Sequence, residues 1–447
     1  MAIDKYLPNV RRQYEDYPYP PCNPLDEKKR LVSLGMDCLD LVNHYCHSGD
    51  KDFSLGVRIL VAGGGTGDEI IFLAEQLRNT DSELIYLDFS NASMGIAQER
   101  ARIRGLKNIA WIHDSLLNIP SLCLGKFDHI CCSGVLHHLE DPVAGLRALA
   151  SVLDDNGAMS IMVYAQYGRT AVYQMQELMG LINQNEDDMA SEIHNCRLVR
   201  DALPTDHWYR LANTSTEYVG DIELYDRYLH SQDRAYTVTQ LYDYVSTADM
   251  KLLQLFNFEN GGNNIYKPGF YIKDKKLLSS ITKLNFIQQQ AIAELLNGRM
   301  LMHSFYLSRK AVLAPNSSSL DYIPAISMMI TNDYSGLSKL VCSSKGMVQI
   351  NLPARNLELV FKITPHTVEF FKHMDGERTI KVIYDNIISL GGDDGERPNY
   401  ESLAEEFSNL FSVLISNNFL HMRHHSIPAS KPVDRLHNQQ YSDTPRS

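Results

Sequence analysis

A run of glycines early in the chain has the composition of a nucleotide-binding loop. The segment VRILVAGGGTGDEIIFLAE places Gly63, Gly65 and Gly67 between an apolar stretch and a helical pattern. Glycines at these positions let the backbone turn sharply and let a ligand approach without interference from a Cβ atom. Because the run follows the first strand of a series of alternating strands and helices, it indicates a binding loop more strongly than a structural turn.

The residue that follows this loop indicates which nucleotide it suits. A dinucleotide-binding loop usually has a third glycine three residues after the second, since the pyrophosphate sits on the helix N-terminus. Here that position is Asp68. Its carboxylate satisfies the positive end of the helix and repels a pyrophosphate. We therefore expect a nucleoside without phosphates, and the negative surroundings favour one that carries a sulfonium.

Polar side chains end three further strands of the expected sheet. Asp88 ends the second strand, where a carboxylate can accept hydrogen bonds from both ribose hydroxyls. Asp114 ends the third strand on the adenine side, and Ser133 ends the fourth, in the crevice where the strand order of such sheets reverses. The local alternatives are that Asp88 caps the following helix and that Asp114 starts a turn.

Alternating strand and helix patterns position these residues. We expect strands over 57–62, 83–87, 108–113, 127–133 and 158–163, and helices over 68–78, 92–104 and 142–153. Such alternation indicates βαβ crossovers, and hence a mostly parallel sheet with helices on both faces. A helix over 238–249, a strand over 251–256 and a final edge strand over 301–307 complete a seven-stranded α/β fold.

Residues 57–164 resemble the class I S-adenosylmethionine-dependent methyltransferases. The three glycines match the glycine motif of the family, Asp88 its acidic ribose ligand, and Asp114 its adenine-side acid. The run GVLHHLEDP matches the segment after the fourth strand. Many members have an acidic residue two positions before the first glycine, where this chain has Val61. The resemblance implies a Rossmann-like fold, S-adenosyl-L-methionine as the cofactor and methyl transfer as the activity.

Aromatic and cationic side chains flank the mouth of the same crevice. The N-terminal run QYEDYPYPP is dense in proline, which is unfavourable inside helices and strands, so we expect an extended arm. It resembles an N-terminal segment of some bacterial members of the superfamily. The residues that we predict to contact the acceptor are Tyr17, Tyr19, His137, Tyr164 and Arg169. An ion pair with a carboxylate of the following insertion is the alternative for Arg169.

Four side chains are conceivable catalytic bases: His137, His138, Tyr164 and His207. Their sequence contexts distinguish none of them, so the catalytic residue is left unassigned. Adjacent residues on a turning segment point in different directions and chelate poorly, so we expect no metal at His137 and His138.

The chain divides into an arm and helix (1–50), a methyltransferase domain (51–313), a linker with a small module (314–425) and a tail (426–447). One amphipathic helix is expected over 25–46. Two interruptions of the domain, 165–236 and 257–300, are too long for loops and predict helical lids. The module is expected to be mainly helical, and the polar, proline-containing tail disordered.

The composition excludes several classes of protein. Apolar residues make up 44% and charged residues 21% of the 447, which is typical of globular domains. The net charge of -12 disfavours general binding to nucleic acid. No apolar run approaches the ~18 residues of a membrane span. The eight cysteines lack a disulfide spacing and indicate a reducing compartment. We expect a cytoplasmic protein without nucleic-acid or membrane partners, of undetermined oligomeric state.

Three functions fit these observations. The leading one is an S-adenosylmethionine-dependent methyltransferase that acts on a small molecule through a lidded pocket. The second is a protein or peptide methyltransferase whose C-terminal module recruits the substrate, since FFKHMDGERTI resembles winged-helix modules that bind peptides in ribosomal-peptide maturation. A regulatory or dimerising role is the alternative for that module. The third function is a binding protein that keeps the cofactor fold without catalysis.

Overall fold

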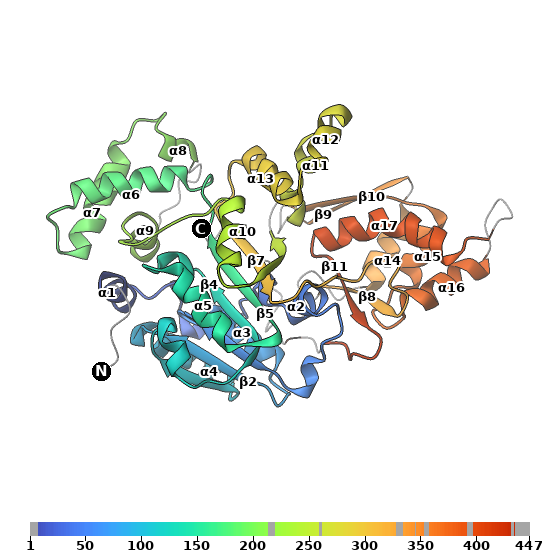
Figure 1. Ribbon diagram of the computed structural model, residues 1–447, viewed down its shortest axis with the longest axis horizontal. Helices are drawn as coiled ribbons and strands as arrows, with labels where there is room; N and C mark the ends of the chain where they lie inside the picture. Colours follow the sequence, from blue (N-terminus) through green and yellow to red (C-terminus); the bar gives the residue numbers. More distant parts are fainter. Residues whose placement is uncertain are drawn as a thin grey trace.

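Seven strands form one sheet in the order β3-β2-β1-β4-β5-β7-β6 (Figure 1). The computed structural model describes residues 8–212, 220–258, 262–327, 334–344, 346–352, 357–390, 397–430 and 433. The strands are β1 (Arg58–Ala62), β2 (Glu83–Asp88), β3 (Ile109–His113), β4 (Phe127–Ser133), β5 (Leu153–Tyr164), β6 (Lys251–Phe256) and β7 (Met302–Ser308). Strands β1 to β5 pair in parallel. The expected Rossmann-like, mostly parallel fold is confirmed.

The last strand corrects one expectation. We expected residues 301–307 to form an edge strand, but β7 lies inside the sheet, antiparallel to β5 on one side and to β6 on the other. Its side chains are correspondingly apolar and buried from Phe305 to Leu307. The edge strand at this end of the sheet is β6, which precedes β7 in the sequence. The order of the strands along the chain therefore differs from their order in the sheet.

Helices cover both faces of the sheet because successive side chains of each strand point to opposite sides. In β1, Ile59 and Val61 join a core with α2 (Leu39–Cys46), α3 (Asp68–Gln76) and α4 (Asn91–Arg104). Leu60 and Ala62 join the opposite core with α5 (Pro142–Val152) and α10 (Val238–Ser246). All four of these β1 side chains are fully buried.

The N-terminal segment differs from the expected arm and single helix. Helix α1 (Pro8–Asp16) precedes an irregular stretch that contains the later prolines. Pro8 is tolerated because it occupies the first helical position, where a missing N–H costs no hydrogen bond. The expected helix over 25–46 is replaced by two 3₁₀ turns, η1 (Pro24–Lys28) and η2 (Gly35–Asp37), and the short α2. Residues 1–7 lie outside the described part.

Both interruptions of the domain are helical where they are described. The first contains α6 (Thr170–Ile182), α7 (Met189–Ala202), α8 (Trp208–Ala212) and α9 (Asp221–Tyr228), which share an apolar core of their own. The second contains η6 (Gly262–Tyr266), α11 (Pro268–Tyr271), α12 (Lys275–Ile281) and α13 (Phe286–Asn297). In Figure 1 helices α6 to α9 project from one side of the sheet, beside α1.

The C-terminal module has a separate apolar core. Its elements are β8 (Tyr322–Ile326), α14 (Tyr334–Ser343), β9 (Met347–Leu352), β10 (Leu357–Lys362), α15 (Pro365–His373), α16 (Ile380–Leu390), α17 (Tyr400–Ser416) and β11 (Leu420–His424). It lies at the far end of the molecule from α6 to α9 (Figure 1). The module joins the domain through α2, where Tyr45 Oη donates to Ile415 O (3.0 Å) and Met422 N donates to His44 Nδ1 (3.3 Å). Most of the expected tail, 431–432 and 434–447, lies outside the described residues.

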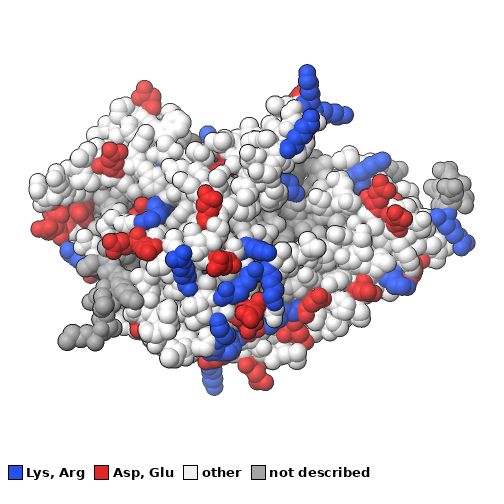
Figure 2. Space-filling model, viewed as in Figure 1, with Lys and Arg blue, Asp and Glu red and all other residues white. Residues whose placement is uncertain are grey.

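Acidic and basic side chains are mixed over the face shown in Figure 2. Its described residues therefore form no continuous basic stripe of the kind that tracks a phosphate backbone. Among the described residues, no helix combines the length and the apolar character that crossing a membrane requires.

A network of buried ion pairs joins the N-terminal segment to α4 and, through Arg100, to α3. The guanidinium of Arg100 on α4 is fully buried, and its Nε donates to Glu27 Oε1 of η1 (2.7 Å) while its Nη1 donates to Asp68 Oδ1 of α3 (2.8 Å). Arg104, one turn later, contacts the other oxygen of Glu27. Glu27 is thus shared by two arginines and is one of the links between the segment and the domain.

We predict that Glu27→Gln lowers the free energy of unfolding by about 1.5–3 kcal/mol, because it removes the carboxylate that two buried arginines share, while Asp68 and Glu75 still pair with them. Urea unfolding followed by circular dichroism measures this change. Asp26→Asn is the matched control, since Asp26 and Lys29 form an exposed pair (3.3 Å) that contributes less than about 1 kcal/mol. Equal stability of the two variants would contradict the role given to Glu27.

Candidate functional site

A cavity of about 370 Å³ lies at the carboxyl ends of the central strands. Its floor includes Gly63, Gly65 and Ser133, and Asp88 forms one wall. The N-terminal segment contributes a roof that includes Tyr14, Tyr19 and Pro20. A second cavity, of about 870 Å³, lies between α17 and the linker, away from these strand ends. The first cavity is the candidate site because parallel sheets bind ligands where their strand order reverses.

The three glycines of the loop have different structural roles. Gly63 (φ +76°) and Gly65 (φ +50°) are in left-handed conformations and line the cavity. A Cβ atom on Gly65 would lie 2.7 Å from the carbonyl oxygen of Tyr19, so the roof can approach only a glycine there. Gly67 (φ +101°) does not line the cavity; a Cβ atom there would lie 2.8 Å from that of Ala97, so it allows α3 and α4 to pack closely.

Asp88 joins the glycine loop to the start of α4. Its Oδ2 accepts a hydrogen bond from Gly65 N (2.8 Å) and its Oδ1 accepts one from Ser90 N (2.8 Å). Burial raises the pKa of Asp88, and these amide donors oppose that rise. The amide of Phe89 also donates to Asp88, and a carboxylate has about four acceptor sites, so at least one is left for a ligand. Asp88 can therefore hold the loop and accept a ligand hydroxyl at the same time.

The other strand-end residues differ in position. Ser133 lines the cavity, whereas Asp114 does not. Asp114 Oδ1 accepts hydrogen bonds from Ser115 N (2.7 Å) and Asn118 Nδ2 (2.7 Å), so it stabilises the turn that follows β3. Glu69, in the first turn of α3, does line the cavity and was not singled out from the sequence. Burial, together with the nearby Asp37 carboxyl, raises the pKa of Glu69, and a hydrogen bond with Ser133 opposes the rise.

Two of the five residues expected to contact the acceptor line the cavity, namely Tyr19 and Tyr164. Tyr17 instead stacks on Tyr225 of α9, with ring centroids 5.6 Å apart. Stacking between the two segments ties the N-terminal roof to the first insertion.

Arg169 lies behind the cavity wall. Its guanidinium sits 3.5 Å from the centre of the Tyr164 ring and pairs with Asp233 Oδ2 (3.1 Å). Asp233 belongs to the first insertion, so this is the ion pair considered above as the alternative for Arg169. The positive charge is thereby held away from the cavity.

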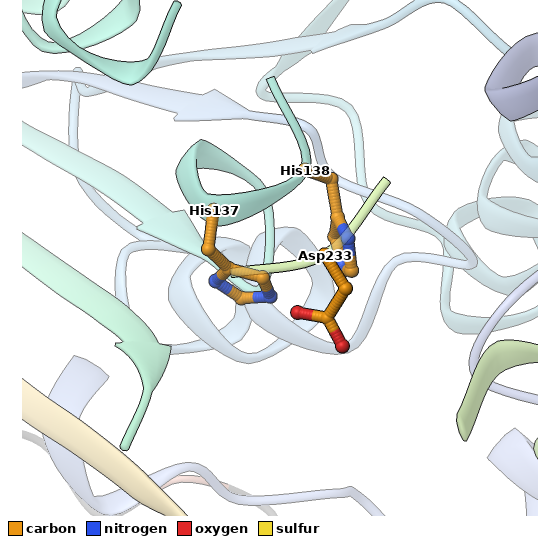
Figure 3. A group of neighbouring side chains, drawn as sticks. All are labelled: His137, His138 and Asp233. Carbon is orange, nitrogen blue, oxygen red and sulfur yellow. The ribbon is translucent and has the colours of Figure 1, made fainter. Parts of the chain in front are cut away.

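His137 and His138 leave the short turn η5 (Leu136–His138) with their rings pointing toward the carboxylate of Asp233 (Figure 3). His137 is fully buried, 3.9 Å from the Tyr164 ring between centroids, and does not line the cavity. Neither of its ring nitrogens has a hydrogen-bond partner among the described residues. Burial, with help from His138 and Arg169, lowers the pKa of His137 well below its usual value, so this ring is neutral.

The acceptor end of the cavity also contains residues that the sequence did not distinguish. Tyr14 and Asp226 line it together with His138. Tyr14 Oη donates to Asp226 Oδ1 (3.2 Å) and lies 3.4 Å from His230 Nε2. Asp226 lies on α9, and His230 follows the end of that helix, so their approach depends on the fold of the first insertion. Their spacing along the chain gave no sign of it.

Two groups of these side chains have ligand atoms close enough to hold a metal ion, within 4.8 Å of one another. In the first, His137, His138 and Asp233, the carboxylate is already paired with Arg169. In the second, His138, Asp226 and His230, the backbone N–H of Gln232 donates to His230 Nδ1 (3.0 Å). A neutral His230 therefore carries its proton on Nε2 and offers no lone pair there. Both donor sets fit a hydrogen-bonded cluster better than a metal centre.

The cavity fits the cofactor that the sequence implies. Among the described residues that line it, five carry carboxyl groups and none is lysine or arginine; the five are Asp68, Glu69, Asp88, Glu140 and Asp226. Such a lining attracts a sulfonium or ammonium group and lacks counter-charges for a pyrophosphate. Asp88 offers acceptors for ribose hydroxyls, and Gly63 and Gly65 leave room for a close approach to the backbone.

Comparison with known proteins agrees with this geometry. A family model described as a methyltransferase domain matches residues 60–159. An uncharacterised protein of Synechococcus sp. is 31% identical over 258 residues, covering 56% of this chain and 60% of that protein. The ubiquinone biosynthesis O-methyltransferase of Albidiferax ferrireducens is 24% identical over 119 residues, covering 27% and 43%. The chain thus spans less than two thirds of these curated relatives.

A solved structure resembles nearly the whole chain. PKMT2 from Rickettsia typhi in complex with AdoHcy superimposes with a TM-score of 0.61 and 15% identity, covering 91% of this chain and 77% of that one. This similarity is one of fold, and it includes the C-terminal module as well as the sheet. The domain model shows a methyltransferase domain over residues 60–159, and the solved structure shows that this domain lies in a fold shared by nearly the whole chain.

Proposed function

We propose that the protein transfers a methyl group from S-adenosyl-L-methionine to a small acceptor molecule. The observation that carries the proposal is the cavity at the strand ends, which is lined by five carboxyl groups and, among its described lining residues, by no lysine or arginine. When bound, S-adenosylmethionine supplies a methyl group on a sulfonium, whose positive charge this lining stabilises. In the proposed complex Asp88 accepts the ribose hydroxyls, while Gly63, Gly65 and Ser133 contact the rest of the cofactor.

The size and cover of the cavity support a small acceptor. Its volume is near the lower end of the range for ligand pockets, about 300–1,000 Å³. The cofactor and the acceptor share this space beneath Tyr14, Tyr19 and Asp226. The carboxyl-rich lining disfavours acidic acceptors, so an amine or an uncharged hydroxyl compound suits it better than a carboxylate or a phosphate ester.

The N-terminal segment is proposed to exclude water and to position both ligands. Thr66 Oγ1 donates to Pro20 O (2.7 Å) and Thr66 N donates to Tyr19 O (3.2 Å), so the roof is fastened directly to the glycine loop. Holding reactants at near-attack distance can lower a barrier by about 7–11 kcal/mol in the best intramolecular cases. In this proposal the chain accelerates the reaction largely by such positioning.

Incubation of the full chain with methyl-labelled S-adenosylmethionine and a cell extract tests the proposed function. We expect label in the small-molecule fraction, beyond a control without the chain. Label recovered in protein would favour a protein acceptor. Binding of the cofactor with no labelled product in either fraction would favour a non-catalytic binding protein.

We predict that Asp88→Asn raises the Kd for S-adenosylmethionine about 10–100-fold. The estimate follows because hydrogen bonds to a charged group contribute about 1.5–3 kcal/mol and each 1.4 kcal/mol is a factor of ten. Isothermal titration calorimetry measures the Kd. Asp274→Asn is the matched control, since Asp274 caps α12 through Leu277 N (2.7 Å) and does not line the cavity. A similar loss of affinity in both variants would argue against a ribose contact at Asp88.

We also predict that deleting residues 1–24 weakens S-adenosylmethionine binding by at least about tenfold, because the roof of the cavity is removed. Calorimetry on the truncated chain gives the Kd, and the labelling assay gives the turnover. The far-ultraviolet circular dichroism of the remaining domain serves as the folding control. Unchanged affinity and turnover in a folded truncated chain would show that the segment does not close the site.

A further inference from the structure

The proposed reaction requires a base wherever the acceptor atom carries a proton, and the structure separates the four bases that the sequence left open. His207 and His137 do not line the cavity. Tyr164 lines it, but burial raises the pKa of its phenol well above the usual value, so the phenol keeps its own proton and is not available as a base. His138 lines the cavity and is the one of the four that remains.

Backbone hydrogen bonds from one residue fix the proton positions of the two stacked histidines. The rings of His138 and His230 lie 3.9 Å apart between centroids, at an interplanar angle of 21°. His138 Nδ1 lies 2.8 Å from the carbonyl oxygen of Gln232, which can only accept, so Nδ1 of His138 carries a hydrogen. The N–H of Gln232 can only donate, so Nδ1 of His230 does not.

The two histidines therefore have opposite tautomers when neutral. His138 carries its lone pair on Nε2, and within the described part of the chain no hydrogen bond to that atom is found. His230 carries its hydrogen on Nε2, 3.4 Å from Tyr14 Oη, which in turn donates to Asp226 Oδ1. Burial and the neighbouring His138 lower the pKa of His230, so it stays neutral.

We propose that Nε2 of His138 is the general base that removes the proton of the methyl acceptor. The assignment rests on the proposed methyl transfer. The acceptor atom forms a bond to the methyl carbon, and the bond from that carbon to sulfur breaks with its electron pair on sulfur. The proton of the acceptor N–H or O–H moves to Nε2 of His138. The resulting imidazolium keeps its Nδ1–H bond to Gln232 O.

The surroundings of His138 suit this change of charge. Asp226 lines the same cavity, and its carboxylate oxygen lies within 4.8 Å of the His138 ring nitrogen, so it stabilises a positive charge on the ring. The positive charge of Arg169 is paired with Asp233. The described titratable and charged groups that face His138 are its neighbour His137, Tyr164 of β5, Asp226 of α9, and His230 and Asp233 of the first insertion.

Nitrogen NMR of the histidine rings tests the assignment without an acceptor. In the full chain, labelled with ¹⁵N in its histidine rings and bound to S-adenosylhomocysteine, the neutral ring of His138 is expected to carry its proton on Nδ1 and not on Nε2. His230 is expected to show the opposite tautomer. Spectra of His138→Gln and His230→Gln assign the two signals. A neutral His138 ring that carries its proton on Nε2 would overturn the proposal.

Kinetics provide the second test, with methyl-labelled S-adenosylmethionine and the small-molecule fraction of the extract as the probe. His138→Gln is expected to lower the labelling rate at saturating cofactor about 100-fold or more, since a general base contributes about 10²–10⁴. Its Kd for S-adenosylmethionine should stay within about threefold. His207→Gln, which changes a histidine outside the cavity, should retain the rate within about twofold.

Different results would overturn the proposed function and the assignment of the base. A wild-type chain that does not bind S-adenosylmethionine would overturn the proposed function. Normal binding and labelling, with His138→Gln retaining more than about a third of the rate, would overturn the base assignment and leave the methyltransferase intact.

Discussion

The carboxylate of Asp88 holds together the parts of the site that come from different elements. It accepts one hydrogen bond from the glycine loop after β1, through Gly65 N, and another from the start of α4, through Ser90 N. Gly65 in turn allows the N-terminal segment to approach, because a Cβ atom at this position would lie only 2.7 Å from Tyr19 O. The loop, the helix and the roof thus depend on one buried charge at the end of β2.

Acidic residues also pair with the arginines near the cavity. Two arginines lie close to its walls, and each is paired with acidic residues: Arg100 with Glu27 and with Asp68, which itself lines the cavity, and Arg169 with Asp233. Of the five carboxyl groups in the lining, Asp68 is thus paired, and no described lining residue is itself a lysine or arginine. A cavity of this kind stabilises a cationic cofactor, and Asp226 extends the same negative field to the acceptor end.

Sequence patterns predicted the central sheet well because each strand carries its own local signal. The apolar run before Gly63, and the polar residue after each of the following strands, depend only on neighbours in the chain. The place of β7 between β5 and β6 does not depend on neighbours in the chain, since it results from pairing across the sheet. Helix α1 was not predicted because the N-terminal segment is dense in proline, which indicated an extended arm. Pro8 is nevertheless compatible with a helix, because it occupies the first position of α1.

The candidate site could be predicted in part. Gly63, Gly65, Asp88 and Ser133 lie together as expected, whereas Asp114 stabilises a turn outside the cavity. The sequence named His138 but could not separate it from three other bases, because its selection depends on the backbone of Gln232, 94 residues later. Asp226, on α9, and His230, just after the end of that helix, carried no local signal of this kind.

The central claim is that a phosphate-free sulfonium nucleoside binds at the ends of β1, β2 and β4. A crystal structure of the full chain grown with S-adenosylhomocysteine tests it most directly. The account predicts that the ribose hydroxyls lie within hydrogen-bond distance of the Asp88 carboxylate and that the sulfur faces His138. A ligand bound elsewhere, or a preference for NAD over S-adenosylhomocysteine in this cavity, would contradict it.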